Sequence, residues 1–375
     1  MTVHKLIKYL ESWAPKGVSW ENDNVGLQIG SEDTIIKNIF LSLELDENSL
    51  KEAIKKKCNF IFTHHPLLFN PLSKIDLKNN PKAKLLETII KNDITVYSAH
   101  TNLDFTKDGV SFELAKRLEL ENIKFLKQES GNQVKLIVFV PIDSADKVSS
   151  AIFNLGGGII GEYSQCSFRA AGVGTFRGSE NSNPALGQKE NFEKVDEVKL
   201  EVLVNNWNLR KVINGLIKAH PYEEPAFDII PLKNENVNFG FGAIGELENS
   251  MKSDEFLTHV CKSLNTKSVR FNKGKNSRIK KVAVCGGSGS RLVNEAMAQN
   301  ADAFVTADIK YHDFQDAENK ILFVDAGHYE TEIFVLNEVK KRIEKLISEE
   351  KNRTNVFKYS RSTNPIRFFN NTGDK

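Results

Sequence analysis

Residues 60–66 read Phe-Ile-Phe-Thr-His-His-Pro, an apolar, β-prone run that ends in two adjacent histidines and a proline. Adjacent side chains of an extended chain point to opposite sides, so a single metal ion is poorly placed to bind both imidazoles of a regular strand. At a strand end, where the chain turns, His64 and His65 are better suited to two metal ions side by side. Surface histidines in a loop are the alternative interpretation.

Predicted strands and helices alternate on both sides of this histidine pair. The predicted elements are a strand at 37–45, a helix at 47–57, a strand at 59–62, a helix at 81–92 and a strand at 94–98. Asp46 is a good N-cap for the first of these helices, and Pro81 suits the first position of the second. This alternation is typical of a parallel α/β sheet.

Ligand-type side chains follow the strands of this predicted sheet. His64, His65, His100 and Asp104 all come just after a strand. In open parallel sheets, ligands bind at the carboxyl ends of the strands. This agreement between residue chemistry and topology favours a metal site over a histidine-bearing surface loop.

A second group of ligand-type residues lies near the C-terminus. Residues 321–324 (ILFV) predict a buried strand, and DAGHYETE follows at 325–332, with a helix continuing through residues 333–347. If His328 already lies in the first helical turn, His328 and Glu332 are at i and i+4 and face the same way, about 6 Å apart at Cβ. An imidazole and a carboxylate on one helical face are a good pair for a divalent metal.

The sequence therefore offers five candidate metal ligands: His64, His65, Asp104, His328 and Glu332. A structural site for one metal would use four ligands, usually including cysteine. Five nitrogen and oxygen ligands, with one carboxylate bridging, suit two metals about 3.5–4 Å apart that keep open positions for water or substrate. Open positions indicate chemistry rather than structural support.

The middle of the chain has a different pattern, from about residue 128. Strands are predicted at 134–140 and 198–204, and helices at 144–155 and 207–219. This order suggests a small ferredoxin-like α+β module. Its glycine-rich loop lacks GxxxxGK[ST], which favours a turn-rich hairpin over a phosphate cradle. His220, a lone histidine near acidic residues, is expected to be structural rather than a metal ligand.

The α/β pattern returns after about residue 234. A strand at 281–285 runs into Gly286-Gly287-Ser288-Gly289, and a helix follows. Amides at a helix N-terminus can hold a phosphate. However, the glycines do not match the dinucleotide fingerprint, and no acidic residue follows at the expected distance. We therefore expect a tight turn that brings the backbone close to the site.

The length and composition of the chain limit the kinds of protein that it can be. The chain has 375 residues, 40% of them apolar and 27% charged, which is enough for two or three domains. The net charge of +2 gives no electrostatic case for a nucleic-acid partner. The four cysteines form no CxxC pair, and no apolar run approaches the roughly 20 residues needed to span a membrane. We predict a cytoplasmic protein.

The motifs THHPLLF (63–69), HTNLD (100–104) and DAGHYETE (325–332) together resemble the Nif-three-like family of dinuclear metal proteins. Many members carry the name GTP cyclohydrolase 1 type 2 homologue. The resemblance runs from the N-terminal helix to STNPIRFF, which ends at residue 369. It implies an α/β fold with two lobes, each a sheet flanked by helices, at residues 1–127 and 233–375. Residues 128–232 then look like an inserted module related to PII and CutA proteins.

The resemblance also implies how the ligands are shared between two metals. By analogy with the family, His64, Asp104 and Glu332 would hold one metal. His65, His328 and Glu332 would hold the other, with Glu332 bridging.

The sequence departs from the family pattern at two positions. Glu44 stands where aspartate is usual, and Ala307 stands where glycine usually precedes Asp308. Neither is an expected ligand, so these departures bear on the shape of the pocket. The resemblance to the family also implies a ring-shaped homohexamer.

We expect a metal-dependent hydrolase with two divalent ions per subunit, zinc, iron(II) or manganese, acting on a small molecule or nucleotide. The family resemblance suggests a GTP cyclohydrolase 1 type 2-like reaction. One alternative is a metal-dependent phosphoesterase on nucleotides or nucleic-acid ends, and another is a non-enzymatic regulatory or scaffolding hexamer. His100 and His312 are candidates for acid/base or supporting roles, with a structural role open for each. The sequence assigns no catalytic residue.

Overall fold

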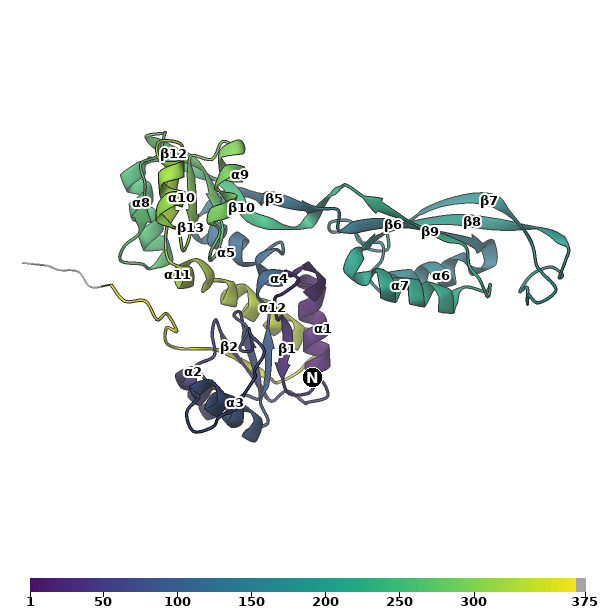
Figure 1. Cartoon of the computed structure of the whole chain (residues 1–375), viewed down its shortest axis with the longest axis horizontal. Coiled ribbons are helices and arrows are strands. Elements are labelled where there is room, and N and C mark those ends of the chain that lie inside the picture. The colour runs from purple at the N-terminus through teal and green to yellow at the C-terminus, as the bar shows by residue number, and fades with distance from the viewer. Residues whose placement is uncertain (369–375) are drawn as a thin grey trace, which may run out of the picture. The chain divides into compact units, whose positions relative to one another are not determined.

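The computed structural model describes residues 1–368 and divides the chain into two compact units (Figure 1). The core unit comprises residues 1–127 and the chain from Gly240 on, and the inserted unit comprises residues 128–239. Each unit has a hydrophobic core of its own. Phe369, the last residue of the STNPIRFF motif, lies outside the described residues.

The inserted unit ends at Phe239 rather than at the expected residue 232. The Phe239 ring packs edge-on against Trp207, with centroids 5.2 Å apart. The side-chain amide of Asn236 donates to two other asparagines of the inserted unit. These contacts attach the first residues of strand β10 (Glu235–Lys252) to the inserted unit, which moves the boundary into the strand.

Five strands form the first sheet of the core unit, in the order β1-β4-β3-β2-β15. Their bounds are β1 (Gly26–Ile29), β2 (Asn38–Ser42), β3 (Phe60–Thr63), β4 (Thr95–Ser98) and β15 (Asn355–Lys358). Strands β15, β2, β3 and β4 are parallel, whereas β1 pairs antiparallel with β4. Strands β3 and β4 are buried at every position, as expected where helices cover both faces of a parallel sheet.

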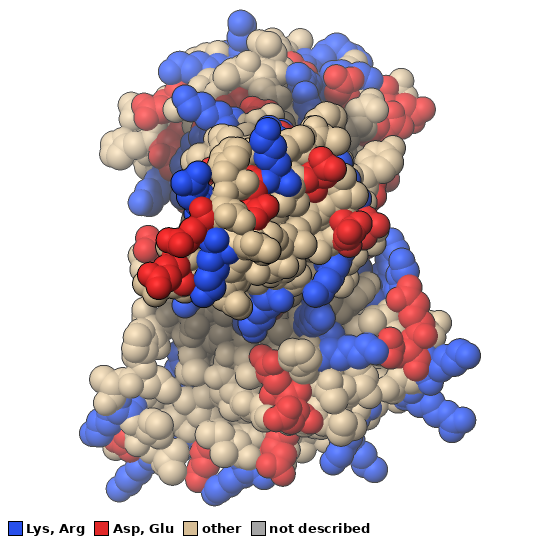
Figure 2. Space-filling model, turned by 90° about the vertical axis from the view of Figure 1, so that its right-hand side faces the viewer, with Lys and Arg blue, Asp and Glu red and all other residues tan. Residues whose placement is uncertain are grey.

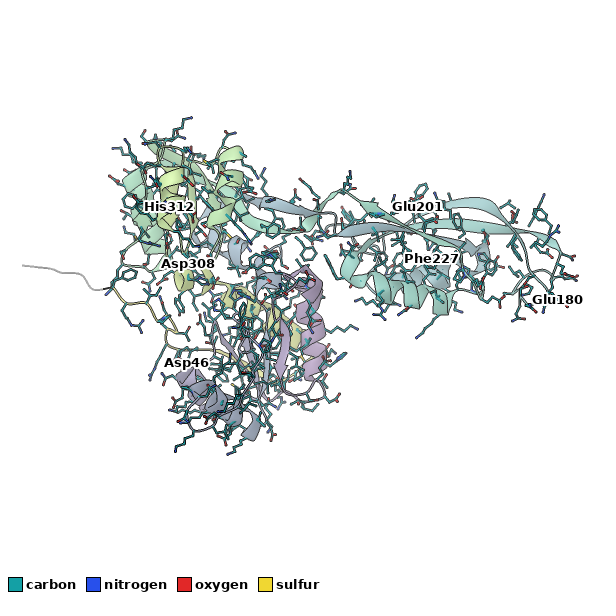
Figure 3. All side chains as sticks on the ribbon, in the orientation of Figure 1. Asp46, Glu180, Glu201, Phe227, Asp308 and His312 are labelled. Carbon is teal, nitrogen blue, oxygen red and sulfur yellow. The ribbon has the colours of Figure 1, made fainter. Side chains whose placement is uncertain are left out.

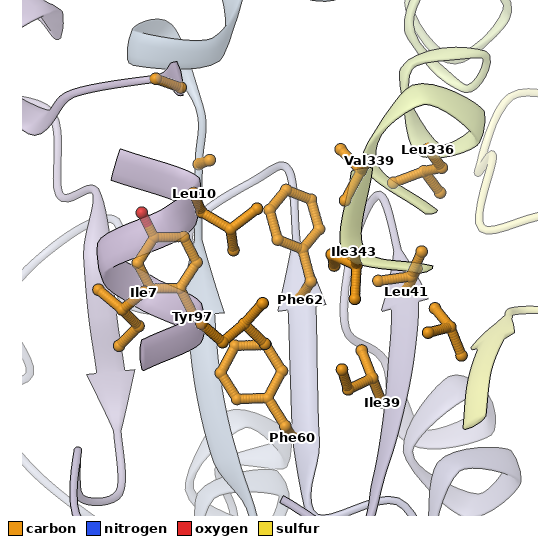
Figure 4. Packing of buried hydrophobic residues seen from close by; sticks show 14 of the residues in the cluster. Ile7, Leu10, Ile39, Leu41, Phe60, Phe62, Tyr97, Leu336, Val339 and Ile343 are labelled. Carbon is orange, nitrogen blue, oxygen red and sulfur yellow. The ribbon is translucent and has the colours of Figure 1, made fainter. Parts of the chain in front are cut away.

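Four helices cover this sheet: α1 (Val3–Trp13), α2 (Glu47–Lys55), α3 (Pro81–Lys91) and α12 (Val335–Glu349). On one face, Leu41, Phe62 and Tyr97 pack with the apolar stripes of α1 and α12 (Figure 4). The alternate residues Phe40 and Ile61 pack with α2 and α3 on the other face. The two-residue period of the strands therefore sorts the apolar side chains into two separate cores.

The second sheet of the core unit has six strands, in the order β11-β14-β13-β12-β10-β5. The bounds not yet given are β5 (Leu120–Ser130), β11 (Arg270–Phe271), β12 (Arg278–Val284), β13 (Ala303–Thr306) and β14 (Leu322–Asp325). Helices α5 (Val110–Arg117), α8 (Ser253–Leu264), α9 (Val293–Ala298) and α10 (Tyr311–Ala317) pack against this sheet. The short helices α4 (Thr101–Asp104) and α11 (His328–Glu332) follow β4 and β14. Strands β12, β13 and β14 are parallel, so their carboxyl ends lie at one edge.

The two lobes are therefore not continuous in sequence, unlike the predicted 1–127 and 233–375. Strand β15 and helix α12 come from the C-terminal part of the chain but complete the first sheet. Strand β5 comes from the N-terminal part and joins the second sheet. The reason is visible on α12, where Val335, Val339 and Ile343 recur every four residues and are buried against the first sheet.

The inserted unit consists of β6 (Gln133–Pro141), α6 (Ala145–Asn154), β7 (Phe168–Arg177), β8 (Phe192–Asn205), α7 (Asn206–Ala219) and β9 (Phe227–Leu232). The strands form one antiparallel sheet in the order β7-β8-β6-β9. This is the β-α-β-β-α-β arrangement of ferredoxin-like modules. The glycine-rich loop leads into the β7–β8 hairpin, as the sequence predicted.

Within residues 1–368, no helix is both long and apolar enough to cross a membrane. The face in Figure 2 has basic and acidic side chains interspersed, in keeping with a net charge of +2.

Candidate metal centre

The candidate site of the core unit is built at the carboxyl ends of parallel strands from both sheets. His64 and His65 directly follow β3, and Asp104 ends the short helix α4 that follows β4. His328 and Glu332 are the first and last residues of α11, which follows β14. The structure thus brings together all five residues that the sequence marked as candidate ligands.

One group of donors lies around His64. Its Nδ1–H donates to the carbonyl of Ala99 at 2.8 Å, which turns Nε2 toward the carboxylates. Nε2 lies 3.5 Å from Oδ1 of Asp104 and 3.8 Å from Oε1 of Glu332. Because Nδ1 carries the proton in this hydrogen bond, Nε2 is the nitrogen that could bind a metal.

The second group of donors also meets at the Glu332 carboxylate. Nε2 of His65 is 3.2 Å from Oε2 of Glu332, and Nε2 of His328 is 3.1 Å from Oε1. The imidazole rings of His65 and His328 are 5.3 Å apart. One buried carboxylate thus contacts three imidazoles from two different strand ends, which is the position a bridging ligand needs.

Three inward-facing atoms are fully buried and make no hydrogen bond within the described chain: Nε2 of His64, Oδ1 of Asp104 and Oε2 of Glu332. Buried polar atoms almost always have a hydrogen-bond partner, so three unpaired atoms at one site indicate that a ligand binds there. All are nitrogen or oxygen donors of the type that divalent transition metals accept. The donor set therefore fits a metal, and the ligand atoms of each proposed triad lie within 4.8 Å of one another.

The electrostatics of the site are those of a negatively charged pocket. Burial lowers the pKa of His65, but its contacts with Glu332 and Glu44 outweigh this effect and raise the pKa to about 10. For His328, Glu332 and Asp308 similarly outweigh burial and raise the pKa to about 9. Burial raises the pKa of the Asp104 carboxyl, and the negative charge of the nearby Glu332 carboxylate raises it further. The site therefore attracts positive charge.

The glycine turn after β12 shapes one wall of the site. Gly287 has φ +60°, and its N–H donates to the hydroxyl of Thr331 at 3.0 Å. A Cβ atom at this position would lie 2.3 Å from Oε1 of Glu332. Only glycine allows this close approach, so the turn brings the backbone to the site as the sequence indicated.

Two supporting carboxylates were not recognised as such from the sequence. Glu44, after β2, accepts a hydrogen bond from Nδ1 of His65 at 2.9 Å. Asp308, after β13 and labelled in Figure 3, accepts one from Nδ1 of His328 at 2.6 Å. One departure from the family pattern is Glu44 itself, and the other, Ala307, is next to Asp308. Glu44 and Asp308 each follow the end of a strand, and this position is the signal that could have identified them as supporting residues.

The three other histidines considered in the sequence analysis differ in their surroundings and in their hydrogen-bond partners. Nδ1 of His100 donates to Asp23 at 3.0 Å, and its ring lies 5.3 Å from that of His64, so His100 borders the site. His312 is exposed on α10, hydrogen-bonded to a neighbour in the same helix, and belongs to no metal-capable group of the described chain (Figure 3). His220 is structural, as predicted, because both of its ring nitrogens have backbone partners.

Replacing Glu44 by leucine should weaken metal binding on the His65 side by about 10- to 100-fold. The substitution removes the carboxylate that orients the His65 ring, whereas the Ala99 carbonyl still orients His64. Calorimetric titration should therefore show one weakened and one unchanged metal site. Glu47→Gln, on exposed α2 surface, is the matched control and should leave both sites unchanged. Equal weakening of both sites would contradict this assignment.

Comparison with known proteins identifies the family. The Duf34/NIF3 family, described as NGG1p interacting factor 3, matches residues 1–365. The chain belongs to the Duf34/NIF3 family. This confirms the family that the three sequence motifs indicated.

Duf34/NIF3 relatives match the chain over nearly its whole length. A protein of Halalkalibacterium halodurans named GTP cyclohydrolase 1 type 2 homolog is 38% identical over 365 residues, which cover 97% of this chain and 98% of the relative. A Bacillus subtilis protein of the same name is 37% identical over 366 residues, covering 97% and 98%. A crystal structure of a Bacillus cereus protein related to NIF3 has a TM-score of 0.83 and 36% identity, covering 98% of this chain and 99% of that one.

Proposed function

We propose that this Duf34/NIF3 protein is a dinuclear metal-dependent hydrolase of the GTP cyclohydrolase 1 type 2 kind. The observation that carries the proposal is the buried Glu332 carboxylate, whose oxygens lie within 3.8 Å of the imidazoles of His64, His65 and His328. His64 with Asp104, and His65 with His328, each form a three-residue group with Glu332 that could hold one ion. The names of the relatives support the reaction class.

Two divalent ions, zinc, iron(II) or manganese, would supply Lewis acidity and a water ionised near neutral pH. The five ligands would bind and orient these ions. His100, fixed through Nδ1 by Asp23, would hold or move a proton at its Nε2 atom beside the substrate. The proposed substrate is a small molecule or nucleotide whose reacting group is a heterocyclic carbon or a phosphoryl group.

Other features of the proposal concern assembly and location. We propose a ring-shaped homohexamer, by analogy with the family, and an inserted unit related to PII and CutA proteins, supported by its ferredoxin-like arrangement. We also place the protein in the cytoplasm. The structure describes all four cysteines as free thiols, which is in keeping with a reducing compartment.

The test is a combined metal and activity measurement on purified protein. Elemental analysis should give two divalent ions per chain, and the loaded protein should open the imidazole ring of GTP, seen as a loss of purine absorbance. His65→Ala should reduce the metal content by one ion per chain and lower the activity by at least about 100-fold. The exposed control His312→Ala should change neither quantity.

The alternatives make different predictions for the same assay. Release of phosphate with the purine ring intact would replace the cyclohydrolase proposal by the phosphoesterase one. If two ions are bound but no GTP, nucleotide or phosphodiester substrate is turned over, and His65→Ala alters only assembly, the hydrolase proposal is wrong. A regulatory or scaffolding hexamer would then be the better interpretation.

A further inference from the structure

The inserted unit contains an aromatic pocket that the candidate metal centre does not use. The pocket has a volume of about 460 Å³, and its wall includes Phe139, Phe176, Glu197 and Tyr222. Pockets of this size are typical of small-molecule sites.

The pocket lies on the face of the sheet that α6 and α7 leave open. On β6, Val138 and Val140 are buried in the core with α6 and α7, so Phe139 between them points to the other face. On β8, Leu200 and Val202 are buried in the same core, which places Glu197 on the open face as well. The strand period thus sets an aromatic ring and a carboxylate on the same surface.

Glu197 is the unusual residue of this pocket. It is only 8% exposed, and its Oε1 accepts a hydrogen bond from the hydroxyl of Tyr222 at 2.9 Å. It forms no ion pair with any lysine, arginine or histidine in residues 1–368. A buried carboxylate without a positive partner is costly, so the fold leaves a charge that a bound cation would neutralise.

The backbone makes room for this carboxylate. A Cβ atom on Gly174 of β7 would lie 2.0 Å from Oε2 of Glu197, so the carboxylate occupies space that only glycine leaves free at this position. Beside it, the N–H of Asn183 donates to Glu223 at 2.8 Å, which holds part of the hairpin loop at the pocket. The carboxylate therefore has a defined position and a loop wall.

The aromatic rings favour an organic cation over a metal ion. Phe176 and Tyr222 have ring centroids 6.0 Å apart, and Phe139 adds a third ring to the wall. Ring faces attract ammonium groups but offer no ligand atoms to a divalent ion. His220 cannot serve as a metal ligand, because Nε2 donates to the Phe139 carbonyl and Nδ1 accepts from the Tyr222 N–H.

The charges around the pocket have the matching sign. Its wall includes three acidic residues and one basic residue: Glu197, Glu223, Glu224 and Arg177. We propose that this pocket binds a small organic cation, an amine or quaternary ammonium compound, whose charged group contacts Glu197 and the aromatic rings. The site is separate from the metal centre, and the proposal does not depend on the hydrolase function.

The test is a titration of the full-length protein with tetramethylammonium, followed by calorimetry and by ligand-observed NMR. Tetramethylammonium has no lone pair and cannot coordinate a metal ion, and variants of the aromatic pocket separate binding there from binding at other acidic sites. Saturable binding is expected. Glu197→Gln, which keeps the shape and the Tyr222 contact, should weaken it by about tenfold or more. Phe176→Leu should also weaken it, because it removes a ring face but little volume.

Glu201→Gln is the matched control, since Glu201 lies on the same strand (labelled in Figure 3) but is not part of this pocket wall. It should leave binding unchanged, and thermal melting should show that all variants are folded. Equal binding by the wild type, Glu197→Gln and Phe176→Leu would overturn the proposal. The proposal would also be wrong if no saturable binding of tetramethylammonium appeared below about 10 mM. Binding of Mn²⁺ instead of tetramethylammonium, abolished by Glu197→Gln, would likewise contradict it.

Discussion

The Glu332→Gln substitution is expected to remove both metal ions, lowering metal affinity by at least about 100-fold at each position. Glu332 is the only residue shared by the two three-residue groups that include a carboxylate. Its oxygens lie 3.1 Å from His328, 3.2 Å from His65 and 3.8 Å from His64. A neutral amide keeps the size of the side chain but cannot bridge two cations. Elemental analysis and calorimetric titration should show the loss directly.

Glu344→Gln on α12 is the control, because its ion pair with Lys340 is exposed and on the same stretch of chain. This variant should keep two ions. Asp104→Asn gives a graded comparison and should lose only the ion on the His64 side. If Glu332→Gln retained one tightly bound ion, Glu332 would be a ligand of a single metal and not a bridge.

The second large effect is on stability as a function of pH. In the metal-free protein, the pKa values of His65 and His328 are raised to about 10 and about 9, from 6.5 in an unfolded chain. Raised values mean that folding favours the protonated imidazoles. Their contribution is complete below about pH 6.5 and is lost as the pH rises through 9 and 10. We expect the free energy of unfolding to fall by about 3 kcal/mol between pH 7 and pH 10. This figure is smaller than the two pKa shifts alone would give, because His328 is about one-third exposed and solvent screens its charge.

Metal reverses this trend, because bound histidines must be neutral and protons compete with the ions. Denaturant melts at several pH values should therefore show that stabilisation by metal grows from pH 7 to pH 9. In the metal-free His65→Gln variant the pH dependence should be weaker, whereas His312→Gln should keep the full dependence. A metal-free wild type equally stable at pH 7 and pH 10 would rule out the charged imidazoles as a source of stability.

Much of the candidate site could be predicted from the sequence because its ligands follow local rules. A strand end after an apolar run places His64 and His65, and the helical period places Glu332 on the same side as His328. The ferredoxin-like order of the inserted unit was also readable, because each of its elements has its own periodicity. These features depend on residues close together in the chain.

Some of the fold could not be read in this way. The helix predicted to run on from His328 is divided into α11 and α12, because the N–H groups of Leu336 and Asn337 bond to carbonyls only three residues earlier. The assignment of α12 and β15 to the first sheet depends on which apolar face is buried where. Sequence periodicity shows that a face is apolar but does not show its partner.

The sequence by itself thus determined the residue types of the candidate centre and the strand ends that present them. Only the tertiary structure decided which carboxylate supports which histidine: Glu44 for His65, Asp308 for His328 and Asp23 for His100. It also decided that a side chain at Gly287 would collide with Glu332 and that Glu197 is buried beside Tyr222 without an ion pair among residues 1–368. These pairings join residues on different strands, and no local period links such residues, because their distance is set by how the strands pair and how the sheets pack.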